Sequence, residues 1–128
     1  GYGLENKLPD DVEHIMPDYG LYNITDTAYG FLTRGCPRHC AFCVVGDKEG
    51  LQSVKVADLS EFWSGQKEIE LMDPNLLACP QRMELLDQLV DSRVVLRHLP
   101  QRCKNLWKSL LTHTGRQINC RFKGSNAP

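Results

Sequence analysis

The residues Thr33-Arg-Gly-Cys36-Pro-Arg-His-Cys40-Ala-Phe-Cys43-Val-Val45 place three cysteines on one short stretch, in the spacing Cys-x3-Cys-x2-Cys. The residues before them, 25–33, are rich in Thr, Tyr and Phe and predict a buried strand. Glycine and proline within residues 34–53 predict a long loop after that strand. Long loops in compact domains are usually functional, so the cysteine stretch predicts a site at the end of a strand.

Three further cysteines, Cys79, Cys103 and Cys120, make an even total of six. Six cysteines in a short chain are compatible with three disulfides, but the clustered triplet and the lack of a visible secretory signal favour metal ligation. A zinc site formed by the triplet with His39 or a distant cysteine is an alternative, although zinc ligands usually come in two pairs. Three thiolates on one loop can instead hold three corners of a four-iron cluster and leave one iron open.

The hydrophobic pattern predicts alternating strands and helices. The expected elements are a helical turn at 10–15, a strand at 25–33, a helix at 56–63, a strand at 68–72, a helix at 80–91 and a possible strand at 94–96. This alternation predicts an α/β fold with a parallel sheet. Because ligands bind at the carboxyl ends of parallel strands, the cysteine loop and the loop Asp73-Pro-Asn75 are expected at one edge of the sheet.

The cysteine spacing, the strand before it and the aromatic Phe42 directly before the third cysteine resemble the radical S-adenosylmethionine (radical SAM) superfamily. Other stretches resemble an uncharacterised bacterial branch of this superfamily, namely the run of residues 8–36 and residues 46–50, 56–63 and 71–79. The resemblance covers roughly residues 3–92. It implies a partial barrel of the (β/α)6 type.

The resemblance also implies a cofactor set and an activity. Cys36, Cys40 and Cys43 would hold a [4Fe–4S] cluster, whose open iron chelates the amino and carboxylate groups of S-adenosylmethionine (SAM). One electron, from a donor such as flavodoxin or ferredoxin, would cleave SAM to methionine and a 5′-deoxyadenosyl radical that attacks a substrate of unknown identity. The cofactor carries the chemistry and the protein supplies binding and shielding.

Three residues are candidates for contact with the cofactor. Phe42 is expected to pack beside the cluster or the adenine. Asp73 and Asn75 stand where the superfamily commonly has a Gly-Gly-Glu type segment, and a carboxylate there could receive the SAM ammonium group. This departure from the family pattern leaves an alternative, in which Asp73 and Asn75 form a turn or a cap. Arg34 and Arg38 flank the cysteines and either lower thiol pKa values or lie on the solvated surface.

The length of the chain limits how much of a barrel it can contain. Each strand–helix unit needs about 30 residues, so a six-unit barrel needs about 200, whereas the chain has 128. The sequence therefore predicts the first two or three units only, with a lead-in at 1–24, the N-terminal part of the core at 25–92 and a basic tail at 93–128. The first residue is Gly, so we expect a piece of a longer product.

The net charge of −1 conceals two segments of opposite sign. Residues 1–92 hold all 16 acidic residues and seven of the 15 basic ones, whereas residues 93–128 hold the other eight basic residues and no Asp or Glu. The tail is either an out-of-frame extension of a truncated gene or a basic arm that contacts nucleic-acid phosphates. The corresponding alternative functions are a metal-stabilised module with a nucleic-acid-binding arm, or an inactive remnant.

The location of the protein is expected to be cytoplasmic. Hydrophobic residues make up 41% of the chain and charged residues 24%, and the longest apolar runs are only a few residues. No segment is long enough to span a bilayer, so no membrane partner is expected.

Overall fold

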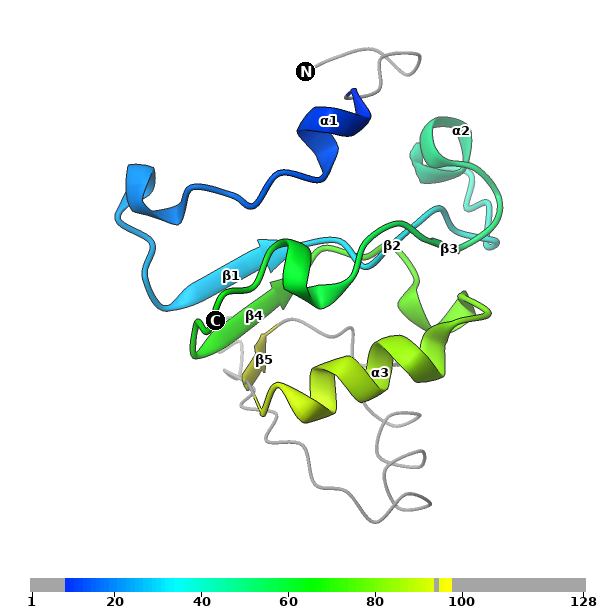
Figure 1. Cartoon of the computed structure of the whole chain (residues 1–128). Helices are drawn as coiled ribbons and strands as arrows, with labels where there is room; N and C mark the ends of the chain where they lie inside the picture. The colour runs from blue at the N-terminus through cyan, green and yellow to red at the C-terminus, as the bar shows by residue number, and fades with distance from the viewer. Residues whose placement is uncertain (1–8, 94, 98–128) are drawn as a thin grey trace, which may run out of the picture.

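The computed structural model describes residues 9–93 and 95–97, and it shows a mixed α/β fold (Figure 1). The predicted basic tail lies outside the described residues, apart from Arg93 and residues 95–97, and so do residues 1–8 of the lead-in. The described elements are, in order, α1 (Asp10–Glu13), η1 (Tyr19–Tyr22), β1 (Thr27–Gly30), β2 (Thr33–Arg34), α2 (Val45–Glu49), β3 (Val54–Lys55), η2 (Leu59–Glu61), β4 (Glu68–Leu71), η3 (Leu76–Ala78), α3 (Arg82–Asp91) and β5 (Val95–Arg97), where η marks a 3-10 helix.

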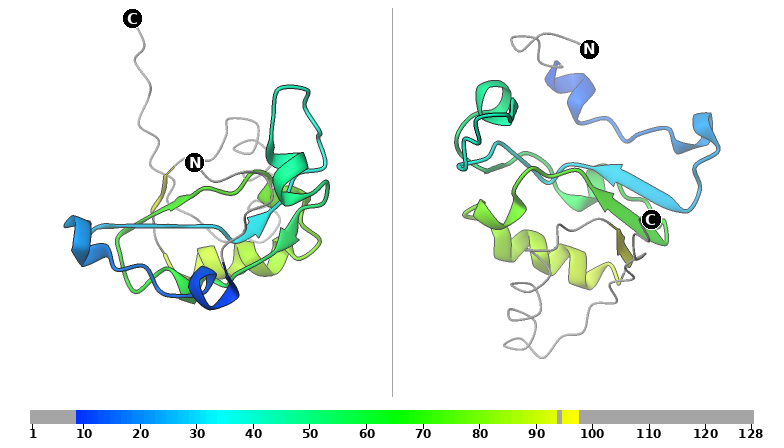
Figure 2. Two further views of the ribbon diagram at one scale, coloured as in Figure 1. Left: turned by 90° about the horizontal axis from the view of Figure 1, so that it is seen from above. Right: turned by 180° about the vertical axis from the view of Figure 1, so that it is seen from behind.

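Strands β1, β4 and β5 form one parallel sheet in that order. In the register Ala28 lies opposite Ile69, and Ile69 lies opposite Leu96. The parallel sheet, the strand at 68–72, the helix at 80–91 and the third strand expected from the sequence are thus confirmed. Figure 1 and the right panel of Figure 2 show the arrowheads of β1 and β4 pointing toward the end of the molecule that carries α2.

The hydrophobic core lies between the sheet and α3. Ala28 and Ile69 of the sheet and Leu85 and Leu89 of α3 are completely buried. The α3 sequence has apolar residues at helical spacing, so one of its faces is buried while Glu84 and Asp87 stay exposed. Burial of each leucine contributes about 2 kcal/mol to the free energy of folding.

The prediction of a helix at residues 56–63 is wrong, because only the single turn η2 forms there. Asp58 and Glu61 form a reciprocal capping box that starts the turn, but the backbone leaves helical geometry at Phe62. This bend lets the Phe62 ring pack directly on Gly30 of β1, where a Cβ atom would stand 2.3 Å from the ring. Packing of Phe62 on the sheet thus takes precedence over the longer helix that the spacing of apolar residues predicts.

The single strand expected at residues 25–33 is divided into two. Residues 27–30 form β1 of the parallel sheet, while Thr33 and Arg34 form β2, which pairs antiparallel with β3. The loop expected at 34–53 is therefore a hairpin, which also contains the short helix α2. Periodicity does not reveal this division, because the hairpin depends on pairing with residues about 20 positions later in the chain.

The lead-in runs along the outer edge of β1 (Figures 1 and 2). The expected helical turn after Pro9 is present as α1. The Tyr19 hydroxyl accepts a hydrogen bond from the Tyr29 N–H at 3.0 Å and lies 2.7 Å from the Phe62 carbonyl oxygen, to which it donates. Because β1 is the edge strand of the described sheet, Tyr19 satisfies a Tyr29 backbone group that no described strand pairs. Within the described part of the chain, no helix is long and apolar enough to cross a membrane.

Candidate functional site

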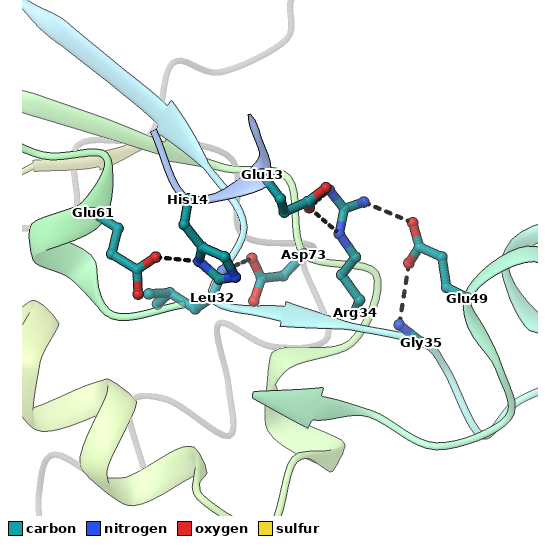
Figure 3. Close-up of polar contacts among 8 residues, drawn as sticks. All are labelled: Glu13, His14, Leu32, Arg34, Gly35, Glu49, Glu61 and Asp73. Atoms are coloured by element: carbon teal, nitrogen blue, oxygen red, sulfur yellow. Dashed lines mark hydrogen bonds and ion pairs between the residues drawn. The ribbon is translucent and has the colours of Figure 1, made fainter. Parts of the chain in front are cut away.

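The loops that follow β1 and β4 meet at the carboxyl end of the sheet, as the sequence predicts. The Asp73 carboxylate accepts hydrogen bonds from the backbone N–H of Leu32 at 2.9 Å and of Thr33 at 2.8 Å. It accepts a third from the Thr33 hydroxyl at 2.7 Å. Figure 3 shows Asp73 lying beside Leu32 at this junction. The same carboxylate therefore joins the end of β4 to the start of the cysteine hairpin.

Burial of the Asp73 carboxyl raises its pKa, while the hydrogen bonds from Thr33 and Leu32 and the charge of Arg34 oppose the rise. These hydrogen bonds reach residues 40 and 41 positions earlier, so they match neither a local turn nor a helix cap, and the turn-or-cap interpretation does not describe them. A carboxylate offers about four acceptor positions, and these hydrogen bonds use three of them. Contact with an ammonium group stays compatible with this arrangement.

The base of the cysteine hairpin is closed by backbone contacts. The Cys36 N–H donates to the Gly50 carbonyl oxygen at 3.1 Å, and β2 and β3 pair just below. Gly35 has φ of +83°, and a Cβ atom on it would stand 2.0 Å from the Gln52 carbonyl oxygen. Only glycine fits such a close approach in left-handed geometry. Cys36, the first cysteine of the hairpin, thus starts from a tightly defined backbone position.

Arg34 forms a salt-bridge network beside the hairpin (Figure 3). Its guanidinium donates to Glu13 of α1 at 3.0 Å and to Glu49 of α2 at 3.0 Å. Glu49 also accepts from the Gly35 N–H at 3.1 Å, and the Arg34 guanidinium lies 4.1 Å from the Phe31 ring centroid. The arginine therefore anchors both helices to the hairpin and does not lie on the solvated surface.

The three cysteines of the hairpin are free thiols. Cys36 and Cys43 are half-buried and Cys40 is exposed. Among residues 9–93 and 95–97, no group of three or more His, Cys, Asp or Glu side chains is gathered closely enough to hold a metal ion. The hairpin tip between Cys36 and Gly50 would therefore have to adjust for three thiolates to reach one cluster.

The other predicted site residues lie at different places on this hairpin. Phe42 is 91% exposed, so its side chain is not packed against the described part of the chain. Arg38 is exposed, in keeping with its solvated-surface interpretation. His39 has φ of +42° and its Nε2 lies 3.9 Å from an oxygen of Asp47, so it faces α2.

Asn75 is the candidate that contacts a cysteine. Its side-chain Nδ2 lies 3.7 Å from Cys36 Sγ, within hydrogen-bonding distance for sulfur. The backbone carbonyl oxygen of Asn75 accepts a hydrogen bond from the buried Ser53 hydroxyl at 2.9 Å. Asn75 thus contacts the hairpin at its first cysteine and at Ser53, beyond the last cysteine.

Sequence reasoning missed three residues that shape the site. Ser53 and Glu49 are separated from their partners by 14 to 22 residues, and no local pattern predicts such contacts. The role of Gly35 could have been predicted from the sequence, since a glycine between a strand and a loop commonly marks a close backbone approach. No protein-family model, curated protein or solved structure matches the chain at a significant level.

Proposed function

We propose that the chain is the N-terminal part of a radical SAM enzyme core, with only the first two or three strand–helix units of a (β/α)6-type barrel. The supporting observation is the position of the Cys-x3-Cys-x2-Cys hairpin, at the carboxyl end of parallel strands β1 and β4. Ligands of parallel α/β proteins bind at this end. The proposal extends to a cytoplasmic protein that takes an electron from a flavodoxin or ferredoxin.

The donor set fits a [4Fe–4S] cluster. Fe–S clusters are held by cysteine thiolates, and Cys36, Cys40 and Cys43 are free thiols on one short, partly exposed loop. None of the three is completely buried in the core, whereas Cys79 is. When bound, the cluster supplies the electron that cleaves SAM reductively.

The chain's own residues have separate roles under this proposal. The three cysteines bind the cluster, and Asp73 holds the hairpin at the edge of the sheet. Phe42, which projects from the hairpin, would cover the bound cluster or the adenine and exclude water. Asp73 and Asn75 remain candidates for contact with SAM, because both lie at the end of β4.

The test is anaerobic reconstitution with iron and sulfide, followed by iron analysis, visible absorption and electron paramagnetic resonance (EPR). We expect about four irons per chain and SAM cleavage to 5′-deoxyadenosine on reduction. Cys36→Ser, Cys40→Ser and Cys43→Ser are each expected to lose the cluster. Cys79→Ser is the matched control and should keep it, because Cys79 lies in the hydrophobic core, outside the three-cysteine motif, and donates to Gln81.

Two other results would contradict the proposal. Colourless protein that binds zinc tightly through the same cysteines would favour a metal-stabilised binding module. Protein that binds neither metal would favour an inactive remnant.

A further inference from the structure

The side chain of Asn75 does not cap the 3-10 helix that begins at this residue. Asn75 is the N-cap residue of η3, and asparagine at an N-cap usually accepts a hydrogen bond from the first turn. Here the side chain makes no capping hydrogen bond. Its amide instead lies at 3.7 Å from Cys36 Sγ. The side chain is therefore directed at the sulfur rather than at its own helix.

Two contacts fix the backbone from which this amide projects. The buried Ser53 hydroxyl donates to the Asn75 carbonyl oxygen at 2.9 Å, and the Ala78 N–H donates to the same oxygen at 3.2 Å. Two residues earlier, Asp73 is bonded to the start of β2. Cys36 is itself held through its N–H by Gly50. Donor and sulfur are thus each held by contacts that do not involve the other.

The direction of the hydrogen bond follows from the chemistry of the groups. A thiolate offers lone pairs and no proton, so only the NH2 end of the amide can face it favourably. Hydrogen bonds to the sulfurs are among the features that set the reduction potential of an Fe–S cluster. A donor stabilises the reduced cluster more than the oxidised one, because the reduced cluster carries one more negative charge and its sulfurs attract the proton more strongly.

We propose that Asn75 is a positioning residue that donates an N–H···S hydrogen bond to the Cys36 thiolate and raises the reduction potential of the cluster. The inference rests on the proposed function, because it requires that Cys36 ligates iron. It differs from a role in SAM binding, since it predicts an effect of Asn75 when no SAM is present.

The experiment is an EPR-monitored redox titration of the reconstituted protein without SAM. Asn75→Ala removes the donor and is expected to shift the midpoint potential to a more negative value. Asn75→Asp has nearly the same shape but places an acceptor and a negative charge against the sulfur, so its midpoint should be more negative still. Gln52→Ala is the matched control, because Gln52 is an exposed amide on the same hairpin, and its midpoint should equal that of the unmodified protein.

The outcomes separate this inference from the proposed function. If the unmodified protein assembles a cluster and both Asn75 variants keep its midpoint, the inference is wrong and the proposed function stands. If the unmodified protein takes up no cluster, both are wrong. Loss of cluster assembly in both folded Asn75 variants would also overturn the inference, because a hydrogen bond that only tunes a ligand is not needed to bind iron. Should Asn75→Ala alone fail to fold, Asn75→Asp carries the test.

Discussion

Asp73, at the end of β4, accepts a hydrogen bond at 2.8 Å from the backbone N–H of Thr33, 40 residues earlier at the start of the cysteine hairpin. This contact joins two segments that no local sequence pattern relates. It sets where the hairpin leaves the sheet, and hence where the three cysteines begin.

Asp73→Ala is expected to destabilise the fold by about 2–4 kcal/mol, because it leaves the N–H groups of Leu32 and Thr33 without their carboxylate acceptor. Asp73→Asn should cost less, since the amide oxygen still accepts one of these bonds. Urea denaturation measures both losses. The exposed Asp11→Ala should change stability little, and an equal loss in that control would contradict the assignment.

The Asp73→Asn variant also tests the second role proposed for this residue. SAM affinity is measured in folded, reconstituted protein by equilibrium dialysis. A lower affinity would support contact between Asp73 and the SAM ammonium group. An unchanged affinity would leave Asp73 with the structural role alone.

Gly35→Ala is expected to open the base of the cysteine hairpin. The new Cβ atom would stand 2.0 Å from the Gln52 carbonyl oxygen, and the residue would be held at φ of +83°. We expect a loss of at least about 2 kcal/mol and less iron bound after reconstitution. Thermal unfolding and iron analysis measure the two effects.

Gly20→Ala is the control for this substitution. Its Cβ atom would approach only the flexible Asp18 carboxylate, at 3.2 Å. Equal iron content in the Gly35 and Gly20 variants would show that the hairpin base does not control cluster binding.

Tyr19→Phe tests the contact between the lead-in and the edge of β1. The change removes the hydroxyl that accepts from the Tyr29 N–H and donates to the Phe62 carbonyl oxygen. Because a partly buried N–H and a carbonyl would lose their partner, we expect a loss of about 1–3 kcal/mol in urea denaturation. Tyr22→Phe, on an exposed side chain of the same 3-10 helix, should have no measurable effect.

The ion pair between His14 and Glu61, with 2.5 Å between Nδ1 and Oε2, makes stability depend on pH (Figure 3). The hydrogen bond to Glu61 raises the pKa of His14 above its ordinary 6.5, so its contribution is complete below that pH and is lost as pH rises through the folded pKa. The backbone hydrogen bond from Asp58 lowers the pKa of Glu61 below its ordinary 4.5, so its contribution is complete above that pH and is lost as pH falls through the folded pKa.

The pair should therefore stabilise the fold most between pH 4.5 and 6.5. Denaturation midpoints compared at pH 5.5 and pH 8 measure the effect, and His14→Gln should reduce the difference between them. Added salt should also reduce it, since the pair is partly exposed. A pH dependence unaltered by His14→Gln would show that another group is responsible.

Much of the fold could be predicted from local patterns. Apolar residues at helical spacing in 82–91 and β-forming residues near 27–30 and 68–71 specify α3, β1 and β4, because burial of one face determines these elements. The same reasoning failed at residues 56–63, where packing of Phe62 on Gly30 decides the backbone. Helical spacing alone does not say whether a sheet will compete for the same side chain.

Some features of the candidate site could likewise be predicted from the sequence, and others could not. The three thiols, their spacing and their place after a strand follow from residue order and from the direction of parallel strands. The contacts of Asp73 with two loops, of Arg34 with two helices and of Asn75 with Cys36 arise from folding and have no local sequence signal. Those roles depend on which groups burial brings within hydrogen-bonding distance of one another, and the chain separates most of the partners by 14 to 41 residues.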